Sequence, residues 1–453
     1  MRRMWTSFAS CLVLGALALP AAPISAQLGG DPVESFVPQL PGAGRPVDIE
    51  ATRARRAALA ANVADGLILI AAEESRDLER DVLQDNDFRQ DDYFFYLTGL
   101  ETPDAWLAMR VRGGRAEETT LFLPTRDPSQ EIWTGLKLGP GNDAERLSGI
   151  AYVRSTDDLD AAIGPLASAS GGANRIFATA PSPAAQMQLR AWAGGSQPSN
   201  LTPRLDALRL VKDAPELERM RRAIDITVVA QRSAMAAAVP GLFEYELEAL
   251  IEYEFRRHGA DRVGFPSIVG SGPNSTTLHY DVNRRQTRDG DLVVMDIGAE
   301  FGQYSADVTR TIPINGRFTP RQKDIYELVL GAQQAAIDAT RPGMTLGRLT
   351  QIARSYIDEN SGNLCGGGSC NRYFLHGLSH WLGMRVHDVG DYGTPLEVGM
   401  VFTIEPGIYI ADEEIGVRIE DDILVTADGA EVLSAGAPRS VADIEALMAA
   451  GGR

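Results

Sequence analysis

Apolar residues recur at three- and four-residue spacing along residues 213–259, in two runs separated by Pro240-Gly241. The apolar positions are Leu217, Met220, Ile224 and Val228 in the first run, and Leu247, Leu250, Ile251 and Phe255 in the second. This spacing places the side chains on one face of a helix. Asp213 is a typical N-cap and Gly259 a typical helix stop. The pattern predicts two helices joined by a Pro-Gly break.

The same plan recurs further along the chain. Thr319-Pro320 starts a helical pattern, Pro342-Gly343 breaks it, and residues 345–360 form the next helix. Repetition of one supersecondary plan indicates an internal duplication. We therefore predict that the C-terminal domain contains two copies of one unit. Chance repetition of common motifs is the alternative.

A short apolar pattern follows each predicted helix pair. Residues 290–298 read GDLVVMDIG and residues 399–407 read GMVFTIEPG, so each has a glycine turn, a mostly apolar run, a carboxylate and a second glycine. Such runs are typical of buried strands. A second strand follows each and adds another carboxylate. The four acids are Asp296, Asp307, Glu405 and Glu420.

These four carboxylates are costly to bury on apolar strands. A buried charge must be paired or must coordinate a metal. If the duplicated halves face each other across a pseudo-twofold axis, the acids meet in one cleft, where they would repel one another. Oxygen-rich ligation with one histidine suits manganese, cobalt, iron or zinc better than copper. Five ligands exceed one tetrahedral zinc but suffice for two metals, whose chemistry favours hydrolysis.

The chain before this duplication has a mixed pattern. Residues 52–64 have a helical pattern, and three runs, 67–71, 93–97 and 120–124, are interpreted as strands. Strands and helices that alternate predict a layered α/β domain. The sequence has no Gly-x-Gly-x-x-Gly after a strand and no Walker motif, so it gives no indication of a nucleotide site there.

Length and charge limit the function classes. The chain has 453 residues, 44% hydrophobic and 23% charged, which predicts a globular protein of more than one domain. Its formal net charge is −18. An acidic chain is a poor partner for nucleic acid or an anionic membrane, because both attract basic patches.

Residues 1–26 have the pattern of a signal peptide. Arg2 and Arg3 form a basic start, residues 11–19 an apolar run too short to span a bilayer, and residues 24–26 a small-residue cleavage site. An uncleaved anchor is the alternative. After cleavage we expect no stable membrane span. Residues 27–46, rich in Gly, Pro and Gln, are expected to be a flexible lead-in.

Two cysteines remain after that cleavage, Cys365 and Cys370, on either side of Gly-Gly-Gly-Ser. In an oxidising compartment such a pair is expected to form a small loop disulfide. A zinc site is less favoured because the sequence has no second cysteine pair. Both the N-terminal pattern and the cysteines predict a periplasmic or secreted protein.

Several segments, in order, resemble the pita-bread metallopeptidases, and among these the Xaa-Pro aminopeptidases (aminopeptidase P). In the C-terminal part they are IVGSGPNSTTLHY (268–280), MDIGAEFGQYSADVTRT, HGLSHWLGMRVHDVG (376–390), TIEPGIYI and GVRIEDDILVT. In the N-terminal part they are RQDDYFFYLTGLETPDAWLAM (89–109) and EIWTGLKLG (131–139). The resemblance covers nearly the whole mature chain.

The resemblance implies an α+β fold: a C-terminal pita-bread catalytic domain of duplicated helix-helix-hairpin units, preceded by an α/β creatinase-like N-terminal domain. We expect the N-terminal domain at 47–205, the metallopeptidase domain at 206–440 and a C-terminal tail at 441–453.

The resemblance also implies two divalent metal ions, with manganese expected and cobalt, zinc and iron as alternatives. Asp307 and Glu420 would bridge them, Asp296 would bind one metal, and His380 and Glu405 would bind the other. A hydroxide between the metals would attack the carbonyl of the bond before proline, and release the N-terminal residue.

Other positions match the family's substrate residues. They are His279, His376, His387, Arg418, Tyr409 and Trp133, of which Trp133 could equally be a packing residue. Glu405 would carry the proton, His279 would stabilise the oxyanion, and His387 would hold the carbonyl after the cleaved bond. The resemblance further implies peptides with proline in second position as substrates, and a homo-oligomer, either dimer or tetramer.

Two rival functions stay open at this point. A prolidase would cut Xaa-Pro dipeptides on the same scaffold, and the metal motifs do not separate it from an aminopeptidase. A non-catalytic peptide-binding module of the same fold is the rival from another class. Loss of a metal ligand would favour that module, and the sequence keeps all five.

Overall fold

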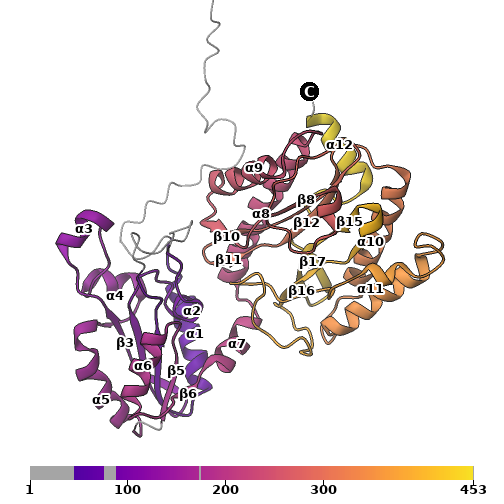
Figure 1. Ribbon diagram of the computed structural model, residues 1–453. Helices are drawn as coiled ribbons and strands as arrows, with labels where there is room; N and C mark the ends of the chain where they lie inside the picture. Colours follow the sequence, from indigo (N-terminus) through magenta and orange to yellow (C-terminus); the bar gives the residue numbers. More distant parts are fainter. Residues whose placement is uncertain (1–44, 76–87, 173–174, 452–453) are drawn as a thin grey trace, which may run out of the picture. The chain divides into compact units, whose positions relative to one another are not determined.

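The computed structural model describes residues 45–75, 88–172 and 175–451 (Figure 1). The expected signal peptide and nearly all of the expected lead-in lie outside the described residues. Among the described residues, no helix combines the length and the apolar character that crossing a membrane requires.

The N-terminal part is built on a six-stranded mixed sheet, with strand order β4-β3-β2-β1-β5-β6. Its strands are β1 (Asp65–Ala71), β2 (Trp106–Arg112), β3 (Arg115–Leu123), β4 (Tyr152–Ser155), β5 (Ile176–Thr179) and β6 (Ser199–Asn200). Its helices are α1 (Ile49–Ala61), α2 (Asp92–Thr98), α3 (Pro128–Thr134), α4 (Asn142–Ser148), α5 (Leu159–Ala169) and α6 (Pro183–Trp192). The expected layered α/β organisation is confirmed.

Strand β1 shows why residues 67–71 form a continuous apolar run. Ile68 and Ile70 pack in one hydrophobic cluster, whereas Leu67 and Leu69 pack in another. Successive side chains of a strand point to opposite faces, so both faces of the sheet are covered here.

The strand predicted at 93–97 is wrong, because this segment is helix α2. The Asp91 carboxylate accepts a hydrogen bond from the Phe94 amide at 2.9 Å, and Gly99 ends the helix with φ of 70°. Nearly every residue of α2 is buried, so its apolar side chains show no single face. A fully buried helix of this length cannot be told from a strand by periodicity.

In the C-terminal part the two predicted helix pairs are confirmed. They are α8 (Ala214–Ala237) with α9 (Glu244–Arg257), and α10 (Pro320–Ala339) with α11 (Leu346–Asn360). Asp213 and Thr319 each form a capping box with the third helical residue, Glu216 and Gln322 respectively. These reciprocal bonds satisfy backbone amides that the first turn leaves free. Helix α7 (Thr202–Leu210) precedes the first pair.

Each helix pair leads to a three-stranded antiparallel sheet. The first sheet has order β12-β9-β8 and the second has order β13-β16-β17. The strands are β8 (Ile268–Ser271), β9 (Leu292–Ile297) and β12 (Val308–Pro313), then β13 (Val401–Ile404), β16 (Asp421–Thr426) and β17 (Gly429–Val432). Smaller strands are β7 (Arg262–Val263), β10 (Ala299–Phe301), β11 (Tyr304–Ser305), β14 (Gly407–Ile410) and β15 (Ile415–Arg418). Short 3₁₀ helices are η2 (Thr156–Asp158), η4 (Gly272–Thr276), η5 (Cys370–Tyr373) and η6 (Ala411–Glu413).

Two buried glutamines occupy matching places in the two halves. Gln231 and Gln333 each lie six residues before the end of their helix, α8 and α10. The Gln231 amide donates to the carbonyls of Met295 and Val308 at 2.9 and 2.8 Å. The Gln333 amide donates to the carbonyls of Ile404 and Ile419, both at 3.2 Å. The same type of glutamine hydrogen bond therefore connects each long helix to its hairpin, as a duplication predicts.

The segment expected to be a C-terminal tail differs from that expectation. Residues Val441–Gly451 form helix α12, which buries Val441, Ile444 and Met448 in the main hydrophobic cluster of the C-terminal part. Their three- and four-residue spacing gives this helix an apolar face.

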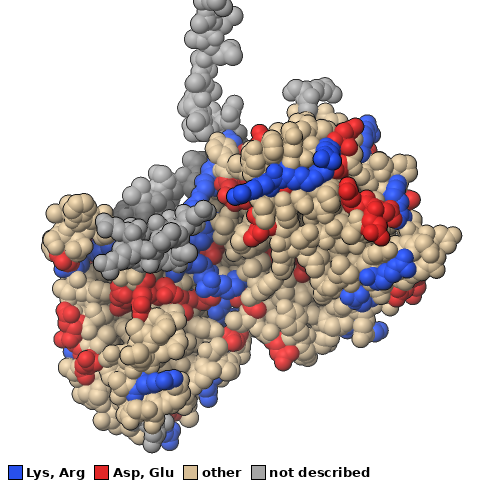
Figure 2. Space-filling model, viewed as in Figure 1, with Lys and Arg blue, Asp and Glu red and all other residues tan. Residues whose placement is uncertain are grey.

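The face drawn in Figure 2 has acidic and basic side chains interspersed among uncharged ones. Acidic residues outnumber basic ones over the whole sequence, 61 against 43. On this face the acidic side chains lie in several separate groups, with basic side chains close to them.

Candidate metal centre and substrate cavity

The four sequence-predicted acids lie at the ends of the paired strands. Asp296 is on β9, Asp307 directly precedes β12, Glu405 directly follows β13, and Glu420 directly precedes β16. All four line one cavity of about 640 Å³. The structure therefore brings acids from both halves together, as the sequence pattern predicts.

Backbone and hydroxyl groups join the two halves at this point. The Glu420 amide donates to the carbonyl of Thr309 at 3.1 Å, and the Thr309 hydroxyl donates to Glu420 Oε2 at 2.6 Å. Thr309 is itself the register partner of Asp296 across β9 and β12. The first hairpin therefore fixes an acid of the second.

His380 lies among the carboxylates. Its Nε2 is 3.3 Å from Asp307 Oδ2, 3.6 Å from Glu405 Oε1 and 3.8 Å from Glu420 Oε1. Its Nδ1–H donates to the carbonyl of Trp381 at 3.2 Å. This bond assigns the tautomer that leaves the Nε2 lone pair directed at the acids, which is the form a metal ligand takes.

The neighbouring backbone holds His380 in place. The Thr403 amide donates to the carbonyl of His380 at 3.0 Å, and the Glu405 amide donates to the carbonyl of Leu378 at 2.8 Å. The segment around His380 thus runs beside β13, which ends next to Glu405.

The donor set fits divalent cations. Within the described residues, Asp296 Oδ1, Asp307 Oδ1 and Glu420 Oε1 are buried and have no hydrogen-bond partner. Donor atoms of Asp307, His380 and Glu420 all lie within 4.8 Å of one another. Buried oxygens without partners are costly. A cation between them would remove that cost, and Asp296 and Glu405 add carboxylate oxygens in the same cavity.

The carboxyl pKa values express the same crowding. Burial and the neighbouring Asp296 charge raise the pKa of Asp307 well above its ordinary value, and burial with the Asp307 charge does the same for Glu420. Burial raises the pKa of Glu405 to about 7. Without a cation these groups would hold protons, whereas a bound cation would favour their charged forms.

Asp296 is the exception among the four acids. Burial acts to raise its pKa, but the Arg418 guanidinium and hydrogen bonds bring that pKa below the ordinary value. Arg418 Nη2 donates to Asp296 Oδ2 at 2.7 Å. Both residues are buried, so this ion pair is shielded from water.

The same arginine starts a polar chain that reaches a predicted substrate residue. Arg418 Nη1 donates to the Tyr409 hydroxyl at 3.0 Å, and that hydroxyl lies 2.8 Å from His376 Nε2. The His376 Nδ1–H donates to the carbonyl of Gly377 at 2.7 Å, so the Tyr409 hydroxyl donates to Nε2. Burial and the Arg418 charge lower the pKa of His376 to about 4, so its ring is neutral near pH 7.

The other predicted histidines also line the cavity. His279, His376 and His387 all contribute to its wall. The ring centroids of His387 and His380 are 4.4 Å apart, nearly edge to face. Burial and the neighbouring His380 and His279 lower the pKa of His387. The imidazole N–H groups of such a wall can donate hydrogen bonds to carbonyl oxygens beside the acids.

Trp133 lies outside this cavity. It is on α3 and 84% exposed, close to the exposed Ile132 and Leu136. At this exposure the Trp133 ring neither packs in the core nor reaches the cavity wall. Its role in substrate binding stays a prediction.

Several residues of the cavity wall are not predicted from the sequence, among them two with large aromatic side chains. Phe265 and Tyr392 line the wall, but both lie in irregular segments without a periodic pattern. Their only signal is position, because each lies close to a motif segment, 268–280 or 376–390.

Comparisons with known proteins agree with this geometry. Residues 218–427 match the model of metallopeptidase family M24, and residues 52–176 match that of the aminopeptidase P N-terminal domain. The chain is 37% identical to the Xaa-Pro aminopeptidase of Haemophilus influenzae over an alignment of 392 residues. This alignment covers 80% of this chain and 88% of that relative.

Solved structures of aminopeptidases also resemble this chain over most of its length. The aminopeptidase PepP of Pseudomonas aeruginosa superposes with a TM-score of 0.81 at 37% identity, over 90% of this chain and 99% of that one. A zinc-substituted Escherichia coli aminopeptidase P in complex with product superposes with a TM-score of 0.81 at 32% identity, again over 90% and 99%. The expected α+β fold, an α/β N-terminal domain followed in the sequence by a pita-bread domain, is thereby confirmed. The chain belongs to the aminopeptidase P group of metallopeptidase family M24.

Proposed function

We propose that the protein is a metal-dependent aminopeptidase that releases the N-terminal residue from peptides with proline in second position. One observation carries the proposal: partnerless buried carboxylate oxygens from both halves converge beside His380 Nε2 in the cavity. The named relatives are Xaa-Pro aminopeptidases, which supports proline peptides as the substrate class.

The residues that would hold the metals are Asp296, Asp307, His380, Glu405 and Glu420. When bound, two divalent cations supply a Lewis acid and a more acidic water. We propose manganese as the native metal, with cobalt, zinc and iron as alternatives. The donor chemistry supports this group of metals without selecting among them.

The chain's own groups would orient the peptide and move the proton. His279 would donate to the carbonyl oxygen on which negative charge develops, and His387 would donate to the next carbonyl. Glu405 would take a proton from water at a carboxylate oxygen and pass it to the leaving nitrogen of proline. Proline lacks a backbone N–H, so recognition must come from its ring, and the apolar wall around Phe265 and Tyr392 is suited to that contact.

Peptide length separates this function from that of a prolidase. The test is hydrolysis of Xaa-Pro peptides of two to five residues by the metal-loaded protein. We expect release of the first residue from the longer peptides and little turnover of the dipeptide. Preference for the dipeptide would establish the prolidase function, and no turnover of any peptide would leave only the binding module.

We also propose that the mature protein works in the periplasm or outside the cell, as a dimer or tetramer. The N-terminal sequence pattern and the two cysteines support the compartment, and the family resemblance supports the oligomer. Fractionation with N-terminal sequencing tests the first proposal. Light scattering on the purified protein tests the second, and a monomer at working concentration would contradict it.

A further inference from the structure

The segment that carries His376 into the cavity has little regular structure. It follows η5, and within it Phe374 packs its ring edge against His376, with centroids 5.2 Å apart. The His376 ring needs a fixed backbone, because its Nε2 must meet the Tyr409 hydroxyl at 2.8 Å. Segments without ladder hydrogen bonds are ordered only if other groups bind their backbone.

Arg354 supplies that binding from helix α11. Its Nη2 donates to the carbonyls of Phe374 and His376, both at 3.1 Å. Its Nη1 donates to the Asn371 side-chain oxygen at 2.6 Å. The guanidinium carbon also lies 4.4 Å from the centroid of the Phe374 ring. One planar cation thus holds the segment at three points and stacks on a fourth group.

We propose that Arg354 is a positioning residue for Xaa-Pro peptide binding, which fixes His376 by holding the backbone of residues 371–376. The inference rests on the proposed function, since it takes His376 as a substrate-binding group. Arg354 is half-buried, and the cavity wall does not include it. It therefore acts through His376 and does not touch the peptide.

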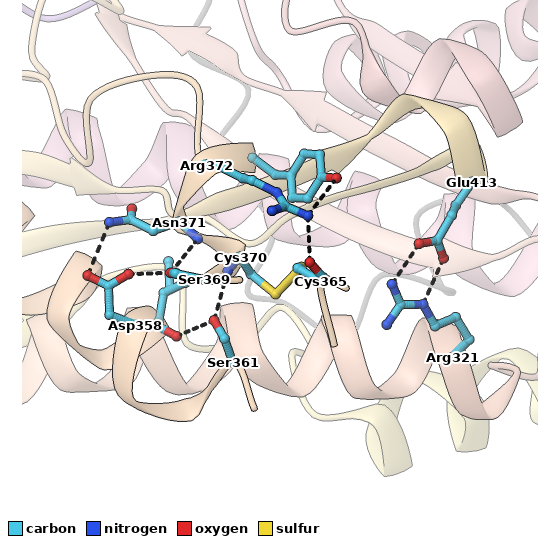
Figure 3. The surroundings of a disulfide bond; sticks show 11 residues. Arg321, Asp358, Ser361, Cys365, Ser369, Cys370, Asn371, Arg372 and Glu413 are labelled. Carbon is cyan, nitrogen blue, oxygen red and sulfur yellow. Dashed lines mark hydrogen bonds and ion pairs between the residues drawn. A yellow bond between two sulfur atoms is a disulfide. The ribbon is translucent and has the colours of Figure 1, made fainter. Parts of the chain in front are cut away.

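The disulfide region holds the start of the same segment (Figure 3). The structure joins Cys365 to Cys370, and the Cys370 amide donates to the Ser361 hydroxyl at 2.9 Å, just beyond the end of α11. Ser369 bonds the Asp358 carboxylate, one turn earlier on α11. These contacts fix residues 369 and 370 but end well before His376. Arg354 reaches further along the segment, to the backbone carbonyl of His376.

The experiment compares Arg354→Ala and Arg354→Lys with Arg321→Ala as the matched control. Arg321 lies in the same region, but its guanidinium donates to both carboxylate oxygens of Glu413, each at 2.7 Å, and not to the backbone of residues 371–376. For Arg354→Ala we expect KM for an Xaa-Pro tripeptide to rise about tenfold while kcat changes less, as for lost ground-state binding. Arg354→Lys should recover only part of the loss, because an ammonium cannot reproduce the planar fork. Arg321→Ala should match the parent.

A second measurement separates positioning from a general loss of structure. In the His376→Ala background, Arg354→Ala should raise KM no further if the arginine acts through that histidine. An equal rise in both backgrounds, or an unchanged KM in a folded Arg354→Ala protein, would overturn the inference. Melting temperature and metal content establish folding for each variant. If the parent protein cleaves no Xaa-Pro peptide, the proposed function itself fails, which is a different result.

Discussion

The two halves of the metallopeptidase domain present their acids at matching strand ends but stabilise them differently. In the first half, Asp296 is ion-paired with Arg418, which belongs to the second half. In the second half, Glu420 accepts from Thr309, which belongs to the first. Each half therefore provides the partner that the other half's acid requires. The comparison teaches that neither copy holds a complete site, although both follow one plan.

The largest expected effect comes from removing one acid of each half. Asp307→Asn and Glu420→Gln should each lower kcat/KM about a thousandfold or more, because bound cations contribute several kcal/mol to such reactions. Metal content measured by mass spectrometry should fall in both variants. The exposed Asp428→Asn should behave as the parent. Full activity of one acid variant would show that the halves do not share their cations.

Metal removal should make stability depend on pH. In the metal-free protein, burial raises the pKa of Glu405 to about 7 from an ordinary 4.5. A raised folded-state pKa gives stability that is present at low pH and is lost as pH rises through the folded value. The melting temperature of the chelated protein, measured relative to that of the metal-loaded protein, should thus fall between pH 4.5 and about 7. The lowered pKa of His376 acts in the opposite direction over part of this range, and the comparison of the two forms removes that contribution. If the melting temperatures of the chelated and metal-loaded proteins depended on pH in the same way, the proposed repulsion among the buried acids would be wrong.

The buried glutamines sharpen the comparison of the halves. Gln231→Leu and Gln333→Leu would each remove two hydrogen bonds to backbone carbonyls, and an unsatisfied buried group costs about 1–3 kcal/mol. Gln333 also donates to Asp421 Oδ2 at 3.0 Å, so its loss should lower the free energy of unfolding more. Urea unfolding measures both. If both substitutions left the free energy of unfolding unchanged, or lowered it equally, these glutamines would not have the stabilising roles that the structure indicates.

The smallest effect is expected at a feature of the second half alone. Cys365→Ser with Cys370→Ser opens a loop of sequence separation 5. For so short a loop the entropic estimate is about 2 kcal/mol of unfolding free energy. Thermal melts under oxidising and reducing conditions measure it. Oxidation of the pair in the native compartment stays a prediction, which free thiols found by mass spectrometry would refute.

Local signals carried most of what could be predicted about the fold. The caps at Asp213 and Thr319 and the apolar spacing behind them identified the long helices, because capping and periodicity are properties of a few consecutive residues. Residues 93–97 misled the interpretation because tertiary burial on all sides removed the helical pattern. Helix α12 has its apolar spacing in the sequence, but over only three buried positions at the end of the chain this signal is too short to distinguish a helix from a tail.

For the site, too, local patterns could be predicted from the sequence, whereas contacts between distant residues could not. The acids and His380 could be proposed because their spacing is repeated and matches a known family. The bonds from Arg418 to Asp296 and from Thr309 to Glu420 join residues far apart in the chain, and periodicity carries no information about such pairs. The contacts of Arg354 with the His376 segment could not be predicted either, because an arginine on a helix face is usually solvated.

The division of the ligands between two halves has a consequence for when the enzyme becomes active. A growing or unfolded chain that does not yet have Glu405 and Glu420 in place lacks two of the proposed cation ligands, so we expect it to bind metal poorly and to cut no peptides. If the chain crosses a membrane unfolded, it takes up its metals only where folding finishes. The supply of ions in that compartment, and not the site alone, would then decide which metal the mature enzyme carries.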